Sequence, residues 1–384
     1  MPAPTWVNLE STLGCNLSCV MCGSHISGAT QARGTMAPEL IAQIEVEVLG
    51  SAHDLSLTVA GEPFMTPRLG TFVELADRTH TALQMNTNAT LIRDSELLNR
   101  VLRSASVLKF SVDGATAETY ERIRVGAEFS AVMANIALVV RRRAELPVEE
   151  QPRLVMCMVL MRSNLHELTA MVDLVSGLGL DGLELAHLTV LDEALDSESL
   201  RHQPEEADAA FERARGRADA LGLRLMLPPR MDGTSQGPTA GARLKTWLQR
   251  AQTIRSPQLR RGLAAIKNRV AIARWERAAG GTVPCRFLRS GTFITVEGDV
   301  NPCPMPGRPV AGSLKDSSFS DIWNGEVLSA MRRGFIEGRP LECCAHCSQN
   351  PAGYDPADER TARPPENSLP EWFERPDAPA GVRG

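Results

Sequence analysis

The sequence predicts an α/β protein with a partial (β/α)6, TIM-like barrel and a small C-terminal domain that contains a β-hairpin and a helix. Two patterns predict the barrel: short β-like runs alternate with helical patterns along residues 5–227, and residues 154–161 are almost continuously apolar. Strand–helix alternation is typical of a parallel sheet covered by helices, and a continuous apolar run is typical of a strand buried on both faces. The 43% apolar composition can supply a sizeable core.

The individual elements follow from local spacing and from residues that begin helices. A proline opens the first expected helix, and Asp94 and Asn164 stand at the starts of two later helices. We expect strands at residues 6–10, 55–59, 83–86, 107–112, 154–161, 183–188 and 223–227. We expect helices at residues 38–49, 69–78, 94–102, 127–142, 164–178 and 204–221. In barrels of this kind the chemistry lies at the C-terminal ends of the strands.

Changes in composition divide the chain into four parts. We expect the barrel at residues 1–227, a basic helical linker at 228–283, the small domain at 284–350 and a Pro-rich tail at 351–384. From residue 230 to residue 277 there are 11 Lys or Arg residues and two acidic residues. This charge indicates either a solvated helical face or a surface that attracts an anionic small-molecule substrate.

Charge and hydropathy limit the classes of protein to consider. The net charge of −5 is too mild to indicate a nucleic-acid-binding protein. No run approaches the roughly 18 consecutive apolar residues of a membrane span, and residues 1–8 lack the pattern of a signal peptide. The nine cysteines gather mainly near the two ends of the chain, which indicates metal ligation in a reducing compartment. We therefore expect a cytoplasmic protein without a membrane partner.

The first cysteine group follows the first expected strand. Cys15, Cys19 and Cys22 have C-x3-C-x2-C spacing. Three thiolates this close can hold three corners of a metal site, and iron–sulfur clusters usually take four cysteine ligands. With no fourth cysteine nearby, one iron would remain open to a ligand that is not protein. A zinc site and buried thiols are the alternatives, although zinc favours paired C-x2-C units.

The second cysteine group lies near the C-terminus. Residues 293–303 have the pattern of a β-hairpin with a turn at Gly298 and Asp299. Two cysteines flank this hairpin and two more form a C-x2-C pair, which together can close a zinc site or an iron–sulfur cluster. This four-cysteine set is Cys285, Cys303, Cys344 and Cys347. Cys343 could replace Cys344, and the spacing alone does not distinguish the two metals.

The first cysteine motif resembles the signature of the radical S-adenosylmethionine (SAM) superfamily, with Met21 at a position that is usually aromatic or apolar. The resemblance implies a [4Fe–4S] cluster on Cys15, Cys19 and Cys22 whose open iron chelates SAM. It also implies reductive cleavage of SAM to a 5′-deoxyadenosyl radical, which takes a hydrogen atom from the substrate. The resemblance further implies a partial barrel.

Later motifs resemble the cofactor-binding segments of that family. The segment Ala60-Gly61-Glu62-Pro63 resembles Gly-Gly-Glu-Pro, where Glu62 and strand-end carbonyl groups would accept hydrogen bonds from the ammonium group of SAM. The resemblance implies cofactor contacts for Met21, Gly61, Glu62, Pro63, Asn88, Ser111, Asp113 and Arg124. An ordinary strand-to-helix turn and ordinary salt bridges are the alternatives for these residues.

The C-terminal cysteine group is similar to the auxiliary-cluster domains of the superfamily, the SPASM type and its shortened twitch form. No cysteine follows Cys347, whereas the full SPASM pattern needs about three more. The resemblance therefore implies one auxiliary [4Fe–4S] cluster on the four-cysteine set. A cluster with all its irons held by protein has no open position for substrate, so we expect a role in electron transfer.

Three functions are consistent with these patterns. We expect first a radical SAM enzyme, of oxidoreductase or lyase type, that acts on a small polar metabolite such as a sugar or aminocyclitol. The reaction would be dehydrogenation, epimerisation or elimination, with flavodoxin or ferredoxin as reductant. The alternatives are a maturase of a ribosomally made peptide and, third, a non-catalytic iron–sulfur or zinc protein. The sequence identifies no catalytic base.

Polar or reactive side chains on the later strands are ambiguous. Cys157 is predicted to be a small core residue. Glu184 and His187 could line a substrate cavity, although a structural histidine is the simpler interpretation. Arg162 could contact an anion or form an ordinary salt bridge.

Overall fold

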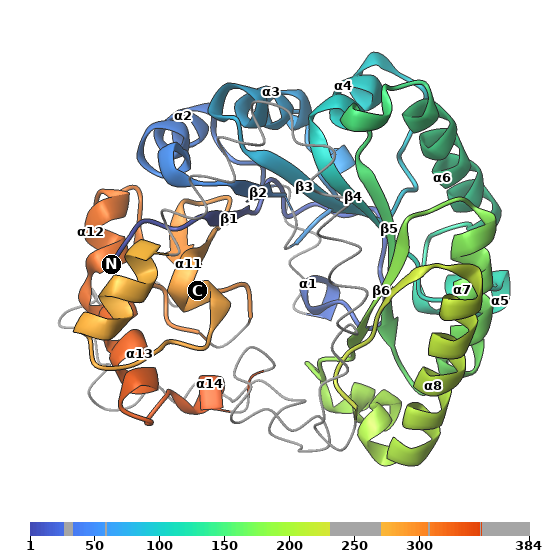
Figure 1. The fold of residues 1–384 in the computed structure, drawn as a ribbon. Helices are drawn as coiled ribbons and strands as arrows, with labels where there is room; N and C mark the ends of the chain where they lie inside the picture. The colour runs from blue at the N-terminus through green and yellow to red at the C-terminus, as the bar shows by residue number, and fades with distance from the viewer. Residues whose placement is uncertain (27–33, 58–59, 231–269, 306–307, 346, 348–384) are drawn as a thin grey trace, which may run out of the picture.

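A computed structural model describes residues 1–26, 34–57, 60–230, 270–305, 308–345 and 347. Within these residues one sheet has ten strands in the order β10-β9-β8-β1-β2-β3-β4-β5-β6-β7. Strands β1 to β7 are parallel and follow chain order, β8 joins β1 in parallel, and β9 and β10 are antiparallel. The sheet curves into an open ring with helices along its outside (Figure 1). The predicted partial barrel is confirmed.

The strands lie close to their expected positions. Their bounds are β1 (Trp6–Leu9), β2 (Asp54–Ser56), β3 (Ala82–Thr87), β4 (Ala105–Ser111), β5 (Arg153–Leu160), β6 (Gly182–His187), β7 (Arg224–Met226), β8 (Gly291–Ile294), β9 (Asp299–Asn301) and β10 (Gly312–Ser313). The expected hairpin is formed by β8 and β9, where Phe293 pairs with Asn301. Gly298 has a φ of 92° in the connecting turn, a conformation that favours glycine.

The barrel helices also follow the expected order, with α1 and α5 as additions. The bounds of the described α-helices are α1 (Gly23–Ile26), α2 (Pro38–Glu47), α3 (Leu69–Thr79), α4 (Glu96–Ser104), α5 (Ala117–Ile123), α6 (Phe129–Ala144), α7 (Leu168–Gly177), α8 (Pro204–Leu221), α11 (Arg286–Ser290), α12 (Phe319–Asn324), α13 (Glu326–Ile336) and α14 (Glu342–Ala345). Most of the expected basic linker and the Pro-rich tail lie outside the described residues.

Two expected helix starts are wrong. Ser95, rather than Asp94, caps α4, because its hydroxyl oxygen accepts a hydrogen bond from the backbone N–H of Leu98 at 3.2 Å. Asn164 does not cap α7. Its side-chain amide instead donates to the backbone carbonyl of Asp113 at 3.0 Å. A polar residue before a helical pattern therefore predicted the right element but not the contact that the side chain makes.

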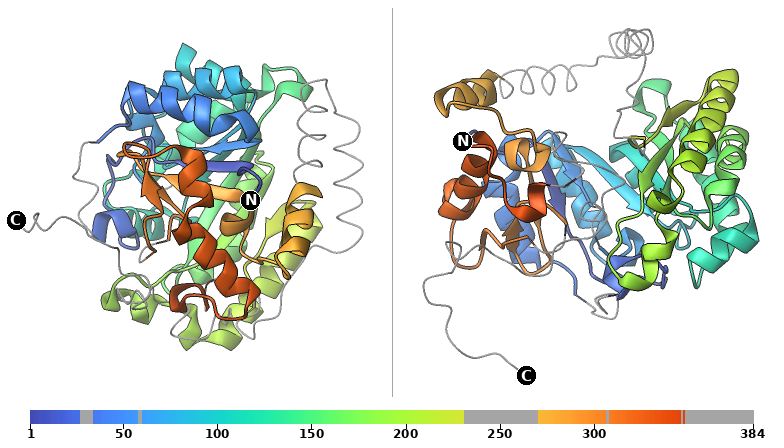
Figure 2. Two further views of the ribbon diagram at one scale, coloured as in Figure 1. Left: turned by 90° about the vertical axis from the view of Figure 1, so that its left-hand side faces the viewer. Right: turned by 90° about the horizontal axis from the view of Figure 1, so that it is seen from below.

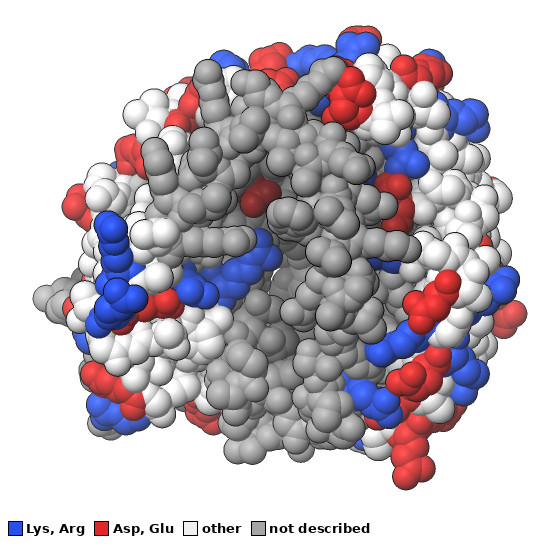
Figure 3. Space-filling model, in the orientation of Figure 1, with Lys and Arg blue, Asp and Glu red and all other residues white. Residues whose placement is uncertain are grey.

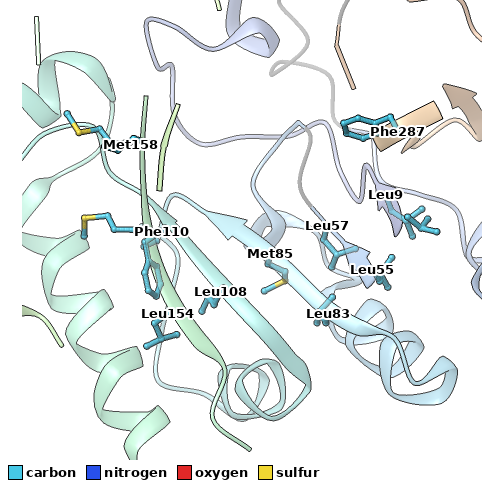
Figure 4. Close-up of a cluster of buried hydrophobic side chains, with 14 of the residues drawn as sticks. Leu9, Leu55, Leu57, Leu83, Met85, Leu108, Phe110, Leu154, Met158 and Phe287 are labelled. Atoms are coloured by element: carbon cyan, nitrogen blue, oxygen red, sulfur yellow. The ribbon is translucent and has the colours of Figure 1, made fainter. Parts of the chain in front are cut away.

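The hydrophobic core lies between the sheet and its helices. Along β4, Leu108 and Phe110 are buried on this outer face, and Leu154 and Met158 of β5 lie beside them (Figure 4). Burial of each such side chain contributes about 1.5–3 kcal/mol, which makes this layer the main source of stability for the barrel. Alternate residues on the same strands point to the inner face.

The beginning of the chain packs against the C-terminal elements. The ring of Trp6 lies 4.6 Å from that of Phe287, and the indole N–H of Trp323 donates to the carbonyl oxygen of Pro2 at 2.8 Å. The N-terminus lies beside the C-terminal helices in two further views (Figure 2). The pairing of β8 with β1 therefore joins the C-terminal domain directly to the barrel sheet. Among the described helices, none is both long and apolar enough to cross a membrane.

Candidate functional site

The loop after β1 places three thiols near one another at one end of the barrel. The backbone N–H groups of Ser18 and Val20 donate to the carbonyl oxygens of Val125 and Ile123 at 2.9 and 3.0 Å, which attach the loop to the end of α5. The pKa of Cys19 is raised to about 11, mainly by burial; Arg124 opposes this rise, while Cys22 and Cys15 contribute to it. Three thiols within electrostatic reach of one another suit three corners of a [4Fe–4S] cluster.

Gly61 lets the next strand-end segment pack tightly against the cysteine loop. Its φ is 71°, and a Cβ atom there would lie 2.8 Å from the carbonyl oxygen of Gly14 and still closer to that of Thr12. The N–H of Glu62 donates to Gly14 O at 2.8 Å. Pro63 is buried at the start of a short 3-10 helix, residues Pro63–Met65. The segment expected to contact the cofactor therefore lies directly against the cysteines.

The Glu62 carboxylate is buried and already holds this end of the barrel together. It accepts hydrogen bonds from Thr87 Oγ1 and from the backbone N–H of Asn88, both at 2.7 Å, and from Phe64 N at 3.1 Å. Burial raises the pKa of Glu62, while these hydrogen bonds lower it. No local pattern predicted these three protein donors to Glu62, and an ammonium group would have to share the carboxylate with them.

Asn88 contacts the cysteine loop directly. Its side-chain N–H₂ lies 3.8 Å from the sulfur of Cys15 and 3.0 Å from Asn16 Oδ1. Ala89 follows with a φ of 61°, at the position where the family resemblance expects glycine. The structure thus brings Asn88 to the expected place, and it adds Asn16, which spacing alone could not identify.

Arg124 and Asp113 form an ion pair beside Cys19. Arg124 Nε lies 2.6 Å from Asp113 Oδ2, and Arg124 Nη1 lies 3.8 Å from the sulfur of Cys19. The other oxygen of Asp113 accepts from Val159 N at 2.7 Å, and its side chain is fully buried. Burial opposes the charge of Arg124, but Asp113 and Cys19 raise its pKa above the ordinary value. Arg124 therefore forms the salt bridge that was the alternative to a cofactor contact, and this salt bridge lies beside Cys19.

The remaining predicted contacts lie near this centre. Ser111 ends β4 and is half-buried, and Met21 packs against a small apolar cluster that includes Ile123 and Met161. Tyr120, which sequence reasoning missed, is fully buried on α5, and its hydroxyl has no hydrogen-bond partner among the described residues. The pattern around Arg124 could have drawn attention to this tyrosine one helical turn earlier.

The inner face of the barrel is polar. Lys109 Nζ lies 2.6 Å from Glu184 Oε2, and Gln84 Nε2 donates to Asp54 Oδ1 at 2.9 Å. Cys157 pairs in register with Ser111 and Glu184 and lies on this face, so its predicted place in the hydrophobic core is wrong. Successive side chains of a strand point to opposite faces of the sheet. A continuous apolar run does not show which residues point to which face.

His187 has a structural role. Its Nε2 lies 2.8 Å from the carbonyl oxygen of Pro229, and its ring lies 6.0 Å from that of Phe211 on α8. Burial lowers its pKa. These contacts favour the structural interpretation, although Nδ1 of His187 is buried and has no hydrogen-bond partner among the described residues. Arg162 is exposed and donates its backbone N–H to Glu198 O at 2.9 Å.

The four cysteines predicted near the C-terminus surround one cavity. They come from the residue before α11, the loop after β9, helix α14 and the residue two positions beyond it. The lining thiols are Cys285, Cys303, Cys344 and Cys347. The sulfur of Cys343 lies 3.9 Å from that of Cys344 and does not line the cavity, which favours Cys344 as the fourth ligand.

The chemistry of this cavity suits an iron–sulfur cluster. Burial raises the pKa of Cys303 to about 12, so a thiolate there needs a metal or a nearby positive charge. The four thiols line one cavity, as cysteine ligands of separate irons in one cluster would.

Two family models match the chain. The radical SAM superfamily model matches residues 9–175, and the SPASM iron–sulfur cluster-binding domain model matches residues 285–348. The chain therefore contains a radical SAM domain followed by a C-terminal SPASM domain. These two domains imply SAM, a [4Fe–4S] cluster that binds it, and an auxiliary iron–sulfur cluster as cofactors.

Two known proteins are similar to this chain in sequence. The chain is 24% identical to the AdoMet-dependent heme synthase of Methanosarcina barkeri over 336 residues, 86% of this chain and 85% of that protein. It is 29% identical to the mycofactocin maturase MftC of Mycobacterium ulcerans over 132 residues, 34% of this chain and 35% of that protein.

Solved structures share the fold. The structure of Streptococcus suis SuiB bound to S-adenosylmethionine has a TM-score of 0.61 and 12% identity, covering 87% of this chain and 68% of that one. The structure of anSMEcpe with bound AdoMet has a TM-score of 0.58 and 15% identity, covering 86% and 79%. At such low identity these likenesses establish the fold alone.

Proposed function

We propose that this radical SAM enzyme cleaves SAM at the site of Cys15, Cys19 and Cys22 and abstracts a hydrogen atom from a small polar metabolite. When bound there, the cluster supplies the electron that cleaves the sulfonium group. The three thiols would each hold one iron. Asn88 and Arg124 lie beside two of the sulfurs, where their N–H groups can stabilise negative charge.

The polar inner face of the barrel carries the proposal about the substrate. The Lys109–Glu184 and Gln84–Asp54 pairs offer both donors and acceptors to a molecule that enters the barrel. An apolar substrate would leave these groups without water and without new partners, which is costly. A sugar-like or aminocyclitol-like molecule can satisfy them. The full-length similarity to a heme synthase also supports a metabolite rather than a protein substrate.

The outcome of the reaction is proposed to be dehydrogenation, epimerisation or elimination. The C-terminal cavity would hold its auxiliary cluster entirely through cysteine ligands, so its role would be to accept an electron from the substrate radical or return one. Flavodoxin or ferredoxin is the proposed reductant. The four parts expected from composition remain our proposed division of the chain.

A second candidate is a maturase of a ribosomally made peptide. The partial similarity to MftC, at 29% identity, favours it, and one SuiB structure contains a precursor peptide. A peptide would have to reach the polar inner face as an extended chain. The two candidates differ in which molecule loses the hydrogen atom.

Anaerobic reconstitution with iron and sulfide tests the proposed activity. We expect about eight irons per chain, from one cluster at each site, and 5′-deoxyadenosine that forms only with dithionite. A matched variant with Cys15→Ala, Cys19→Ala and Cys22→Ala should keep about four irons and form no 5′-deoxyadenosine. Intact SAM after reduction of the fully loaded wild type would contradict the proposal, and zinc at the C-terminal site would contradict the auxiliary cluster.

Deuterated substrates then separate the two candidates. Transfer of deuterium from labelled sugars or aminocyclitols into 5′-deoxyadenosine would support the metabolite. Transfer from labelled peptides, with none from the small molecules, would support the maturase instead.

A further inference from the structure

A half-buried arginine lies at the C-terminal cavity. Arg308 lines this cavity together with the four thiols, while the rest of the lining consists of apolar side chains such as Phe287, Met331 and Phe335. Among the described lining residues, Arg308 is the only one with a charge. In the space-filling view, basic side chains gather beside the central hollow on the side of α11 (Figure 3).

The charge of Arg308 is coupled to the cysteines rather than held by water. Burial disfavours the charged form, yet the sulfurs of Cys343, Cys303, Cys344 and Cys347 raise its pKa above the ordinary value. In such apolar surroundings a charge acts more strongly on its neighbours than it would in water.

We propose that Arg308 is the positioned counter-charge of the auxiliary cluster and raises its reduction potential. Reduction of the cluster by one electron adds one negative charge beside the guanidinium group and forms or breaks no bond. A nearby positive charge therefore stabilises the reduced state more than the oxidised state. This inference rests on the four-cysteine ligand set proposed above and goes beyond it, since spacing and the family assign no role to Arg308.

The consequence for function concerns the direction of electron flow. A higher potential makes the auxiliary cluster a better acceptor for an electron from a substrate radical. Arg308 would thus favour net oxidation of the substrate over return of the electron. It acts through the cluster and does not need to touch the substrate.

The test is a redox titration with dithionite, followed by electron paramagnetic resonance, on the full-length reconstituted protein. Cys15→Ala, Cys19→Ala and Cys22→Ala are present in all samples, so that only the auxiliary cluster gives a signal. Arg308→Gln should reduce the ratio of reduced to oxidised cluster about tenfold at a fixed potential, about 59 mV for a one-electron couple. Arg308→Lys, which keeps the charge, should retain most of the wild-type potential.

Two further variants keep the test decisive. Arg308→Met has a neutral side chain that fills similar space, and it replaces Arg308→Gln if that protein loses its cluster. Arg333→Gln is the control, because Arg333 is exposed on α13 and pairs with Glu326 at 2.6 Å. The reduction potential of the auxiliary cluster should not change in this variant.

An unchanged potential in a neutral variant with about four irons would overturn the inference. So would an equal fall in the Arg308→Lys protein, or loss of its cluster. Loss of the cluster from both neutral variants, but not from Arg308→Lys, would support the inference in another form. It would show that assembly of the auxiliary cluster depends on the positive charge at this position. Since SAM cleavage is not measured, failure here is distinguishable from failure of the proposed reaction.

Discussion

At the scale of single residues, the site depends on close approach and on compensated charge. Gly61 allows one strand-end segment to reach the backbone of the cysteine loop, and Asp113 compensates the charge of Arg124 beside Cys19. Neither contact requires a bound cofactor. The protein's own groups therefore help to fix the position of its first cysteine group.

Gly61→Ala tests the close approach. The new methyl group would collide with the carbonyl oxygens of Thr12 and Gly14, so the cysteine loop must move. We expect the variant to retain about four of about eight irons, all at the C-terminal site, and to form no 5′-deoxyadenosine. Gly216→Ala is the matched control, because no atom lies within 4 Å of a Cβ there. Full iron content in the Gly61→Ala protein would show that the loop tolerates the displacement.

Arg124→Gln tests the buried ion pair. It leaves the fully buried Asp113 carboxylate without its cation, and such a loss typically costs about 3–5 kcal/mol. Urea unfolding under anaerobic conditions should show this fall in the free energy of unfolding. Arg142→Gln, which breaks exposed pairs with Asp94 and Glu145, should lower the free energy of unfolding much less. Similar losses in both variants would mean that burial does not matter here.

At the scale of elements, each barrel strand separates stability from function by its alternation. On β4, Phe110 packs into the core beneath the helices, and its neighbour Lys109 reaches Glu184 on the inner face. The core side of the strand stabilises the fold, while the polar side is available to a substrate. Two adjacent substitutions can therefore separate the two roles.

Phe110→Ala and Lys109→Ala form this pair. Phe110→Ala should lower the free energy of unfolding by about 3–5 kcal/mol, because it creates a cavity in a close-packed core. Lys109→Ala should cost less than about 1 kcal/mol, since it removes a partly exposed ion pair, but it should weaken substrate-dependent turnover. The measurements are urea unfolding and 5′-deoxyadenosine formed with substrate. Unaltered turnover in the Lys109→Ala protein would remove the inner face from the proposed substrate site.

At the scale of the whole molecule, the C-terminal domain extends the barrel sheet. The N-terminal strand β1 lies between β2 and β8, so the barrel and the C-terminal domain share one continuous sheet. The Glu10 carboxylate, just after β1, accepts a hydrogen bond from the backbone N–H of Val296 at 3.1 Å. This contact crosses the boundary between barrel and C-terminal domain.

Glu10→Gln tests how the contribution of this contact to stability depends on pH. Burial raises the pKa of Glu10 above its ordinary value of 4.5, so the folded state holds the proton more tightly than the unfolded state does. The contribution of Glu10 to stability is therefore largest when it is protonated and falls as the pH rises above about 4.5. Glutamine can still accept from Val296 without a charge. We expect the stability of the variant relative to wild type, measured by urea unfolding, to increase as the pH rises above about 4.5. A difference that does not change with pH would contradict the assignment.

Local patterns in the sequence determined the order of strands and helices, the two cysteine groups and the hairpin near the C-terminus, because periodicity, turn residues and ligand spacing depend only on neighbours along the chain. The tertiary structure decided which side chains meet. It placed three donors on Glu62, turned Cys157 to the inner face, chose Cys344 over Cys343 for the cavity and brought Arg308 beside the thiols. Such contacts join residues far apart in sequence, and burial and charge act between them through space, so no local pattern records them.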